Sequence, residues 1–288
     1  MVMVLALLLV IPLGLDLYMP VPEGNPITSA KIALGRKLFH DQRLSRTGTI
    51  ACASCHDPER AFSDKRPLAV GVFGRTGQRH APALINRGYG RSFFWDGRIA
   101  TLEEQVLKPI QDPNEMDLSL AEASSRVGLG VPAISQALAS YIRSILSGDS
   151  PYDRFINGNL RALTDEQKRG MQIFRGRGNC TACHVGPTFS DERFHNTGVA
   201  WQNDRLQDEG RANGTFKTPT LREVARTAPY MHNGSLTTLT DVVNFYSDGG
   251  RKNPFLDTDV RPLRLTDEEK QALIRFLESL SGAVSEGS

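Results

Sequence analysis

Cys52-Ala53-Ser54-Cys55-His56 is the stretch around which the chain is organised, and the same pattern returns as Cys180-Thr181-Ala182-Cys183-His184. The two stretches use all four cysteines of the chain. A Cys-x-x-Cys-His stretch is typical of covalent c-type haem attachment, because two cysteines three residues apart reach both vinyl groups of one porphyrin. The histidine that follows then faces the iron from the proximal side. The sequence therefore predicts two covalently bound c-type haems, with His56 and His184 as proximal ligands.

The four cysteines have two other interpretations. Two Cys-x-x-Cys pairs can together hold one structural zinc ion, but these pairs lie more than a hundred residues apart, far beyond the usual spacing of a zinc ribbon. Zinc also leaves both histidines unexplained. Redox-active dithiols or disulfides are the second alternative. The histidine that follows each pair favours haem over both.

Length and charge limit the classes of function. The chain has 288 residues, which suits two modest domains that each bury a core around one haem. Its formal charge is +2, from 34 basic and 32 acidic residues. Bulk electrostatics therefore gives no reason to expect a polyanionic partner, and we expect no nucleic acid partner.

The N-terminal segment matches a signal peptide only in part. Val2–Leu15 is an apolar run about as long as a signal-peptide core and too short to span a bilayer. It has no basic start, because the first Lys or Arg is Lys31, and no small-residue cleavage site. We interpret residues 1–25 as a leader-like segment and expect no other membrane association. Haem attachment to Cys-x-x-Cys-His normally takes place outside the cytoplasm, so the motifs predict a periplasmic protein.

Capping residues and apolar spacing predict three helices in the first half of the chain. One begins at Thr28 or Ser29 and continues through the apolar residues before the first haem motif. Thr101-Leu102-Glu103-Glu104 is a capping box that opens a short helix ended by Pro109. The third helix is expected over Val131–Leu146.

The second half of the chain begins in the same way. Thr164-Asp165-Glu166-Gln167 is a capping box that opens a helix leading to the second haem motif. Two further helices are expected over Thr238–Tyr246 and Thr266–Leu280, the last with a capping box of its own.

The order of these elements predicts two similar domains. The polar, breaker-rich stretch Ser147–Pro151 is the expected joint between a domain of residues 26–150 and a domain of residues 151–288. A similar sequence precedes the haem motif in each half, Gly35–Phe39 in the first and Gly170–Phe174 in the second, which indicates an internal duplication. Strand signals are scarce. The predicted fold class is mainly α, with two cytochrome-c-like haem domains related by internal duplication.

Six stretches of the chain together resemble one known family. They are Leu34-Gly35-Arg36-Lys37-Leu38-Phe39, Leu44-Ser45, the first haem motif, Phe94-Trp95-Asp96-Gly97-Arg98, Glu115-Met116 and Ala228-Pro229-Tyr230-Met231-His232-Asn233-Gly234. On these residues the chain resembles the bacterial di-haem cytochrome c peroxidase and MauG family from about Ile32 onward. Within it, the chain is most similar to MauG-like oxidases, with the methanobactin-associated branch as one candidate. The resemblance implies that the N-terminal haem meets peroxide and the C-terminal haem stores or relays an electron.

The face of each iron opposite its proximal histidine decides the class of enzyme. In the peroxidases of this family a switchable histidine occupies that face of the first iron, and the resemblance places Val72 at its position. Valine cannot bind iron. His80 stands where the family usually carries Asn beside Pro, and it is a poor substitute. The first haem is therefore expected to be five-coordinate and open, as in MauG-like proteins.

The resemblance also assigns residues to the peroxide pocket. Glu115 matches the catalytic Glu of the family, and a pocket carboxylate can take a proton from one peroxide oxygen and return it to the other. Gln105 and Pro109 match other residues that line this pocket in MauG-like proteins. Without the resemblance, Glu115 would be interpreted as a surface acid after the turn Asp112-Pro113-Asn114.

The second haem has two candidate sixth ligands, Tyr246 and Met231. A thioether favours ferrous iron, whereas a tyrosinate favours ferric iron. Alignment on Pro229-Tyr230 places Tyr246 where the peroxidases carry Met and MauG carries Tyr, so we favour Tyr246. The alternative roles are helix packing for Tyr246 and filling of the core for Met231. His195 and His232 are further histidines of this half.

The two tryptophans are expected to differ in role. Trp95 corresponds to the tryptophan that lies between the haems in the family, where an indole can relay oxidising equivalents. The alternative for Trp95 is a core aromatic, and Trp201 is expected to be only that.

The family also carries a calcium ion between its domains, bound by an Asn side chain and by backbone oxygens at Thr-x-Pro. Thr227-Ala228-Pro229 matches the second element, which makes Thr227 and Pro229 candidate calcium ligands. His80 stands at the position of the Asn. Because calcium prefers oxygen ligands, this departure counts against the site.

The resemblance predicts a di-haem oxidase of MauG type. Such an enzyme uses hydrogen peroxide to form high-valent iron and oxidises a partner protein by long-range electron transfer. The expected partners are hydrogen peroxide and a periplasmic redox or substrate protein. The first alternative is a conventional cytochrome c peroxidase, which reduces peroxide to water with electrons from a small redox protein. The second alternative is a non-enzymatic electron-transfer cytochrome.

Overall fold

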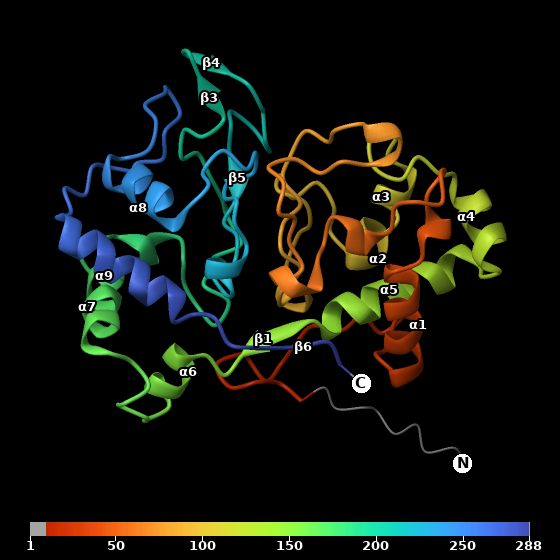
Figure 1. Cartoon of the computed structure of the whole chain (residues 1–288), viewed down its shortest axis with the longest axis horizontal. Helices are drawn as coiled ribbons and strands as arrows, with labels where there is room; N and C mark the ends of the chain where they lie inside the picture. The colour runs from red at the N-terminus through yellow and green to blue at the C-terminus, as the bar shows by residue number, and fades with distance from the viewer. Residues whose placement is uncertain (1–9, 288) are drawn as a thin grey trace.

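The structure, a computed structural model, describes residues 10–287 and contains two groups of helices with loops and short strands between them (Figure 1). The mainly helical fold class is confirmed. The first group consists of α1 (Ser29–Phe39), α2 (Leu102–Gln105), α3 (Lys108–Gln111), α4 (Leu120–Val127) and α5 (Val131–Ser144). The second group consists of α6 (Pro151–Ile156), α7 (Asp165–Arg175), α8 (Leu239–Ser247) and α9 (Asp267–Glu278).

The strands of the described residues form three antiparallel pairs. They are β1 (Leu146–Gly148) with β6 (Ala283–Ser285), β2 (Phe194–His195) with β5 (Phe216–Lys217), and β3 (Trp201–Gln202) with β4 (Arg205–Leu206). The pairs are too short to form a sheet with a core of its own. The first of these pairs runs between the two helix groups, below them in Figure 1.

The caps expected from the sequence are present. Thr28 accepts a hydrogen bond from the backbone N–H of Lys31 at the start of α1. Reciprocal capping boxes open α7 at Thr164, α8 at Thr238 and α9 at Thr266. The four helices expected over these stretches are confirmed, with ends that differ by one or two residues.

Two of the expected helix ends are wrong. Pro109 does not end the helix that Thr101 caps, because α2 stops before it and Pro109 lies in the first turn of α3, where its missing N–H is not needed. The helix expected to reach Leu146 ends at Ser144, since Leu146 enters β1 and pairs with Ser285. A strand partner so distant in sequence leaves no mark in a local helical pattern.

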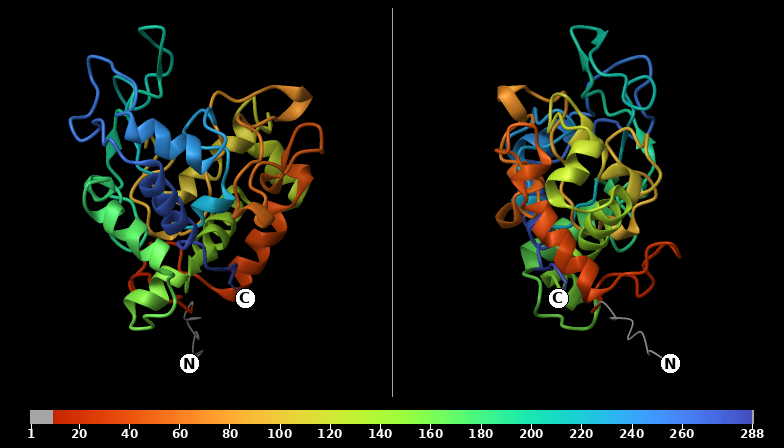
Figure 2. Two further views of the ribbon diagram at one scale, coloured as in Figure 1. Left: turned by 60° about the vertical axis from the view of Figure 1, so that its left-hand side comes forward. Right: turned by 90° about the vertical axis from the view of Figure 1, so that its right-hand side faces the viewer.

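Each helix group buries its own hydrophobic core, and Figure 2 shows the two groups side by side. The first core forms where α1 packs on α5, and the second where α7 packs on α9. Aromatic rings meet edge to face at the centre of each core, three in the first and four in the second. The aromatic residues are Phe39, Phe62 and Tyr141 in the first core, and Tyr152, Phe174, Phe189 and Phe276 in the second.

The two helix pairs cross in the same way. A Cβ added at Gly35 of α1 would collide with the backbone carbonyl of Ala137 in α5. A Cβ added at Gly170 of α7 would collide with the carbonyl of Ala272 in α9. Glycine is required at both crossings because any side chain would push the two backbones apart. The likeness of the crossings agrees with the internal duplication, which stays a prediction.

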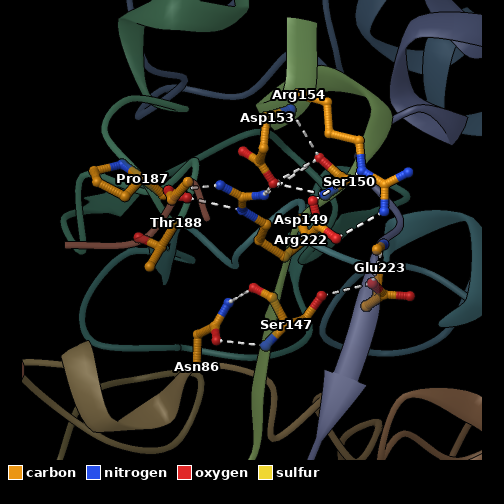
Figure 3. A network of polar contacts seen from close by, with 12 residues as sticks. Asn86, Ser147, Asp149, Ser150, Asp153, Arg154, Pro187, Thr188, Arg222 and Glu223 are labelled. Carbon is orange, nitrogen blue, oxygen red and sulfur yellow. Dashed lines mark hydrogen bonds and ion pairs between the residues drawn. The ribbon is translucent and has the colours of Figure 1, made fainter. Parts of the chain in front are cut away.

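The chain passes between the two cores at Ser147–Pro151, where the side chains of Ser147 and Ser150 are buried (Figure 3). The backbone N–H of Ser147 donates to Asn86 Oδ1 at 2.9 Å, and its hydroxyl donates to Glu223 Oε1 at 2.6 Å. Glu223 also accepts a hydrogen bond from the backbone N–H of Gly282 at 2.6 Å. These bonds connect residues of both helix groups, so the joint is a buried, hydrogen-bonded contact.

A buried ion pair lies beside this joint. Arg222 Nη1 pairs with Asp153 Oδ2, and both side chains are 1% exposed. Asp153 also accepts a hydrogen bond from the hydroxyl of Ser150 at 2.7 Å, while Arg222 Nε donates to the carbonyl of Pro187 at 2.8 Å (Figure 3). Arg222 Nη2 donates to the carbonyl of Gly14 at 2.9 Å. All the nitrogens of the guanidinium are therefore engaged at the joint.

Part of the leader-like segment packs along the joint. The carbonyl of Leu13 accepts a hydrogen bond from the backbone N–H of Asp149 at 2.8 Å. Met19 is buried beside β1. Residues 10–25 thus contact the folded protein, whereas residues 1–9 of the expected leader lie outside the described residues.

Candidate functional site

One continuous cavity of about 750 Å³ is lined by residues from both halves of the chain. Its walls carry both Cys-x-x-Cys-His stretches, so the two haem motifs share one interior space. Every residue that the sequence assigns to haem attachment, to the peroxide pocket, to the sixth ligand or to electron relay lines it: Cys52, Cys55, His56, Trp95, Gln105, Pro109, Glu115, Cys180, Cys183, His184, Met231 and Tyr246.

The ring of His56 is oriented by one hydrogen bond. Its Nδ1 lies 3.1 Å from the carbonyl oxygen of Phe62, which can only accept, so Nδ1 carries the proton and Nε2 keeps its lone pair. Burial lowers the pKa of His56, which favours the neutral ring that iron binds. A carbonyl partner on the other ring nitrogen is the usual support of a metal-binding histidine.

His184 is held in the same way in the second half. Its Nδ1 lies 2.8 Å from the carbonyl oxygen of Phe189, and burial lowers its pKa. Phe62 and Phe189 have φ angles of 59° and 53°, so a residue with left-handed backbone accepts the hydrogen bond after each motif. The two histidines are thus equivalent in geometry and protonation.

The four cysteines are unpaired. Burial raises the pKa of Cys52 and Cys180 to about 12 and that of Cys55 to about 11, so these side chains are neutral thiols. Within residues 10–287 the four cysteines do not meet at one point, which rules out a four-cysteine zinc site there. Neutral thiols beside a neutral histidine on the wall of a cavity fit a c-type haem in each half.

Neither residue considered for the face opposite His56 presents a free iron ligand in this structure. Val72 is 1% exposed and does not line the cavity. His80 lines the cavity, but its Nδ1 lies 3.0 Å from the carbonyl oxygen of Arg66 and its Nε2 lies 3.1 Å from the hydroxyl of Ser63. Both ring nitrogens are therefore engaged, and His80 keeps no free lone pair.

Glu115 reaches the cavity from the turn that follows α3. The backbone N–H of Val72 donates to the carbonyl of Glu115 at 2.8 Å, which fixes this turn against the neighbouring loop. Burial, with the Asp112 carboxylate adding to it, raises the pKa of Glu115 to about 7. A carboxyl group that titrates near neutral pH can both accept and return a proton. Gln105 and Pro109 line the same cavity.

The two candidate sixth ligands of the second haem have different surroundings. Tyr246 lies on α8, and burial raises the pKa of its phenol above the usual range. The sulfur atoms of Cys183 and Cys180 act in the same direction, so the phenol lies close to the second motif. Met231 precedes His232. The carbonyl of His232 accepts a hydrogen bond from the backbone N–H of His80, in the first half, at 2.7 Å. These contacts associate Tyr246 with the second motif and the Met231 segment with the contact between the halves.

Trp95 lies where the two halves of the chain meet. Its Nε1–H donates to the carbonyl of His80 in the first half at 2.8 Å. Its own carbonyl accepts a hydrogen bond from the backbone N–H of Lys217 in the second half at 2.8 Å. An oxidisable ring is thus held from both halves of the chain on the wall of the shared cavity.

Comparison with known proteins identifies the family. Residues 29–161 match the family model described as di-haem cytochrome c peroxidase. The methylamine utilization protein MauG of Methylorubrum extorquens is 36% identical over 285 residues, which cover 91% of this chain and 81% of that protein. This chain belongs to the MauG and di-haem cytochrome c peroxidase family. It is therefore a peroxide-dependent oxidoreductase of a family that carries two c-type haems, and the resemblance inferred from the sequence is confirmed.

Members of both branches of the family are similar to this chain. The cytochrome-c peroxidase IdrP2 of Denitromonas iodatirespirans is 35% identical, over 91% of this chain and 84% of that protein. A crystal structure described as a MauG-like protein associated with microbial copper homeostasis matches with a TM-score of 0.85 and 31% identity, over 92% of this chain and 93% of that chain. Membership of the family alone does not separate a MauG-type oxidase from a conventional peroxidase.

The residues present do not fit the calcium ion expected from the family. The side chain at the Asn position is His80, both of whose ring nitrogens are engaged. Between the candidate ligands Thr227 and Pro229, the carbonyl of Ala228 accepts a hydrogen bond from the Arg60 guanidinium at 3.0 Å. Calcium needs several oxygen ligands, and a fixed positive charge beside them opposes a second cation.

Trp201 is not the core aromatic that the sequence suggested. It lies in β3, on the hairpin that projects at the top of Figure 1, and it is partly exposed. Its ring centroid lies 6.1 Å from that of Phe255, a residue that is 50% exposed. The hairpin extends away from the second core, so the ring cannot reach it.

Two charged groupings beside the cavity are missing from the sequence predictions. Arg79 Nε lies 2.7 Å from Asp208 Oδ2, and this ion pair connects the two halves of the chain. His195 lies between Asp191 and Asp257. Asp208 and Asp257 stand 129 and 62 residues from their partners, so no local pattern indicates these pairs. The single local signal is the four-residue spacing of Asp191 and His195.

Proposed function

We propose that the protein is a di-haem oxidase of MauG type, which uses hydrogen peroxide to oxidise a partner protein over a distance. The observation that carries this proposal is that neither Val72 nor His80 offers a free ligand on the side of the first haem site opposite His56. Val72 does not line the cavity and both ring nitrogens of His80 are engaged, so neither provides a ligand that must leave. A site of this kind can take peroxide in its resting state.

The N-terminal half is assigned to peroxide binding. Cys52, Cys55 and His56 would hold the first haem, which when bound supplies an iron atom at which peroxide is reduced. The carboxylate of Glu115 takes a proton from one peroxide oxygen and returns it to the leaving oxygen. The amide of Gln105, which can both donate and accept hydrogen bonds, orients the peroxide in the same cavity.

The C-terminal half is assigned to electron storage and relay. Cys180, Cys183, His184 and Tyr246 would hold the second haem, which when bound would supply an iron atom that stores an electron. Trp95, which is hydrogen-bonded to both halves, carries electrons between them. The support for Tyr246 is its position beside the cysteines of the second motif.

The electrons come from a second protein. The expected partner is a small redox protein, or a substrate protein whose aromatic side chains are oxidised in place, and we place both in the periplasm because covalent haem attachment takes place outside the cytoplasm. No helix of residues 10–287 combines the length and the apolar character needed to cross a membrane.

A spectrum of the resting ferric holoprotein, followed by peroxide addition, tests this function. We expect one high-spin and one low-spin haem, and a reaction with peroxide that needs no prior reduction. A protein that turns over peroxide only after partial reduction is a conventional cytochrome c peroxidase. Two six-coordinate haems that do not react with peroxide indicate an electron-transfer cytochrome.

The ligand of the second haem is tested by Tyr246→Phe, with Met231→Leu as the matched variant. Loss of the phenol oxygen should convert the second ferric haem from low spin to high spin, because phenylalanine cannot bind iron. Met231→Leu should leave the spectrum unchanged. Electron paramagnetic resonance of both ferric proteins makes the comparison, and the opposite pattern would assign the iron to Met231.

A further inference from the structure

His195 lies between two carboxylates beside the second haem motif. Its Nδ1 lies 2.6 Å from Asp257 Oδ2, and its Nε2 lies 3.0 Å from Asp191 Oδ2. The side chains of His195, Asp191 and Asp257 are 15%, 9% and 23% exposed. No step of the proposed function uses these residues.

The geometry fixes the charge of the imidazole. An ionised carboxylate only accepts hydrogen bonds, and a neutral imidazole has one donor and one acceptor nitrogen. Both ring nitrogens of His195 face carboxylates, so both carry a proton and the ring is an imidazolium. The pKa of His195 is raised first by the sulfur of Cys183 and then by the two carboxylates, and the carboxylates keep this effect when Cys183 is joined to a haem. The three side chains together carry a net charge of −1.

The three residues connect two segments of the chain that border the second haem site. Asp191 follows the second motif, and its backbone N–H donates to the carbonyl of Cys183 at 2.9 Å. Asp257 belongs to residues 251–257, which follow α8, the helix that carries Tyr246. The imidazolium therefore ties the segment after the motif to the segment after the candidate ligand.

Further hydrogen bonds run along the same two segments. The backbone N–H of Asp257 donates to the carbonyl of Asn196 at 3.0 Å, and that of Arg251 donates to the carbonyl of Thr197 at 3.2 Å. The side-chain amides of Asn253 and Asn196 lie 3.1 Å apart. His195 thus begins a row of contacts that holds residues 251–257 in place.

Part of this row and the chain that follows it line the cavity. His195 and Thr197 are wall residues, as are Val260 and Leu263 beyond residues 251–257, and the same cavity is lined by Tyr246 and the second motif. Residues 251–257 themselves do not line it. The other titratable groups that face His195 are Cys183 and His184 of the motif itself.

We propose that Asp191, His195 and Asp257 form a charged latch that anchors residues 251–257, and with them the adjoining wall residues Val260 and Leu263, beside the second haem and sets the reduction potential of that haem. The latch residues are positioning residues, since they act on the haem through the segment they hold and through their charge. The inference rests on the proposed function, because it assigns the latch to the haem that His184 binds.

Two variants of the holoprotein separate charge from packing. His195→Gln and Asp257→Asn both remove the ion pair between His195 and Asp257, but the first takes the net charge of the latch from −1 to −2 and the second takes it to 0. Negative charge near the haem stabilises ferric iron. The reduction potential of the second haem, measured by spectroelectrochemical titration at pH 8, should therefore fall in His195→Gln and rise in Asp257→Asn.

His40→Gln, at an exposed histidine of the first half, is the matched control and should leave the potential unchanged. Unchanged potentials in both latch variants, or shifts of the same sign and size, would overturn the electrostatic role. Mass-spectrometric hydrogen exchange of residues 251–257 gives an independent readout. Exchange should be faster in both latch variants than in His40→Gln, and wild-type exchange rates in both would overturn the mechanical role.

These measurements are independent of peroxide chemistry. If wild-type protein failed to react with peroxide, the proposed function would be wrong, while the opposite potential shifts would still support the latch. If the potentials and the exchange rates stayed at their wild-type values in a protein that reacted normally with peroxide, the latch would be wrong and the proposed function would stand.

Discussion

Replacing Glu115 with glutamine should slow the reaction of the resting protein with peroxide by about 10²- to 10⁴-fold, the usual contribution of a general acid–base group. Glutamine keeps the size and the polarity of the side chain but cannot take up a proton from peroxide. Stopped-flow absorbance of the ferric holoprotein mixed with peroxide measures the rate constant. Glu104→Gln, at an exposed residue of α2, is the matched control and should react like the wild type.

The pH dependence of the same rate constant makes the test more specific. Burial raises the pKa of Glu115 to about 7, and only the ionised carboxylate accepts a proton. The rate constant of the wild type should therefore rise with pH through about 7 and level off above it. In Glu115→Gln this step should be absent. A glutamine variant that reacts at the wild-type rate would assign proton transfer to another group.

The largest loss of stability is expected from Arg222→Ala. The change leaves the carboxylate of Asp153 buried without its partner, which typically destabilises a protein by about 3–5 kcal/mol. The free energy of unfolding of the holoprotein, measured by urea denaturation, should fall by that amount. Arg222 also donates hydrogen bonds to the carbonyls of Pro187 and Gly14. Its removal should therefore weaken the contact between the two halves of the chain.

Arg154→Ala is the matched control for this experiment. Arg154 pairs with Asp149 near the same joint, but the two side chains are 53% and 41% exposed. Water screens a pair of this kind, so its removal should leave the unfolding midpoint close to that of the wild type. If the free energy of unfolding fell equally in the two variants, the buried pair would stabilise the protein no more than the exposed pair.

The sequence predicts those parts of the fold that local chemistry determines. Thr164 and Thr266 mark their helices because a capping box satisfies backbone groups within four residues. Leu146 was assigned to a helix because its partner in β1–β6, Ser285, lies far away in the chain. Pro109 was assigned to a helix end because proline has the same local signature at the end of one helix and in the first turn of the next.

The same division applies to the candidate site. The haem motifs are contiguous, so Cys52–His56 is recognisable at once, and Glu115 follows from the family resemblance. The pairing of His195 with Asp257 depends on how the loop after α8 folds back on the motif, which no spacing records. The engagement of both ring nitrogens of His80 likewise depends on Ser63 and on a backbone carbonyl that approach it only in the folded chain.

The pairing of β1 with β6 bears on the order in which the protein is assembled. Leu146 can pair only after Ser285 has been synthesised, 139 residues later in the chain, so the two halves are joined by this strand pair only at the end of synthesis. Domains that emerge first generally fold first, so the N-terminal core can form while its strand is still without a neighbour. Both Cys-x-x-Cys-His stretches precede β6 along the chain. We therefore expect both porphyrins to be attached before the last strand pairs with β1 and fixes the two halves against each other.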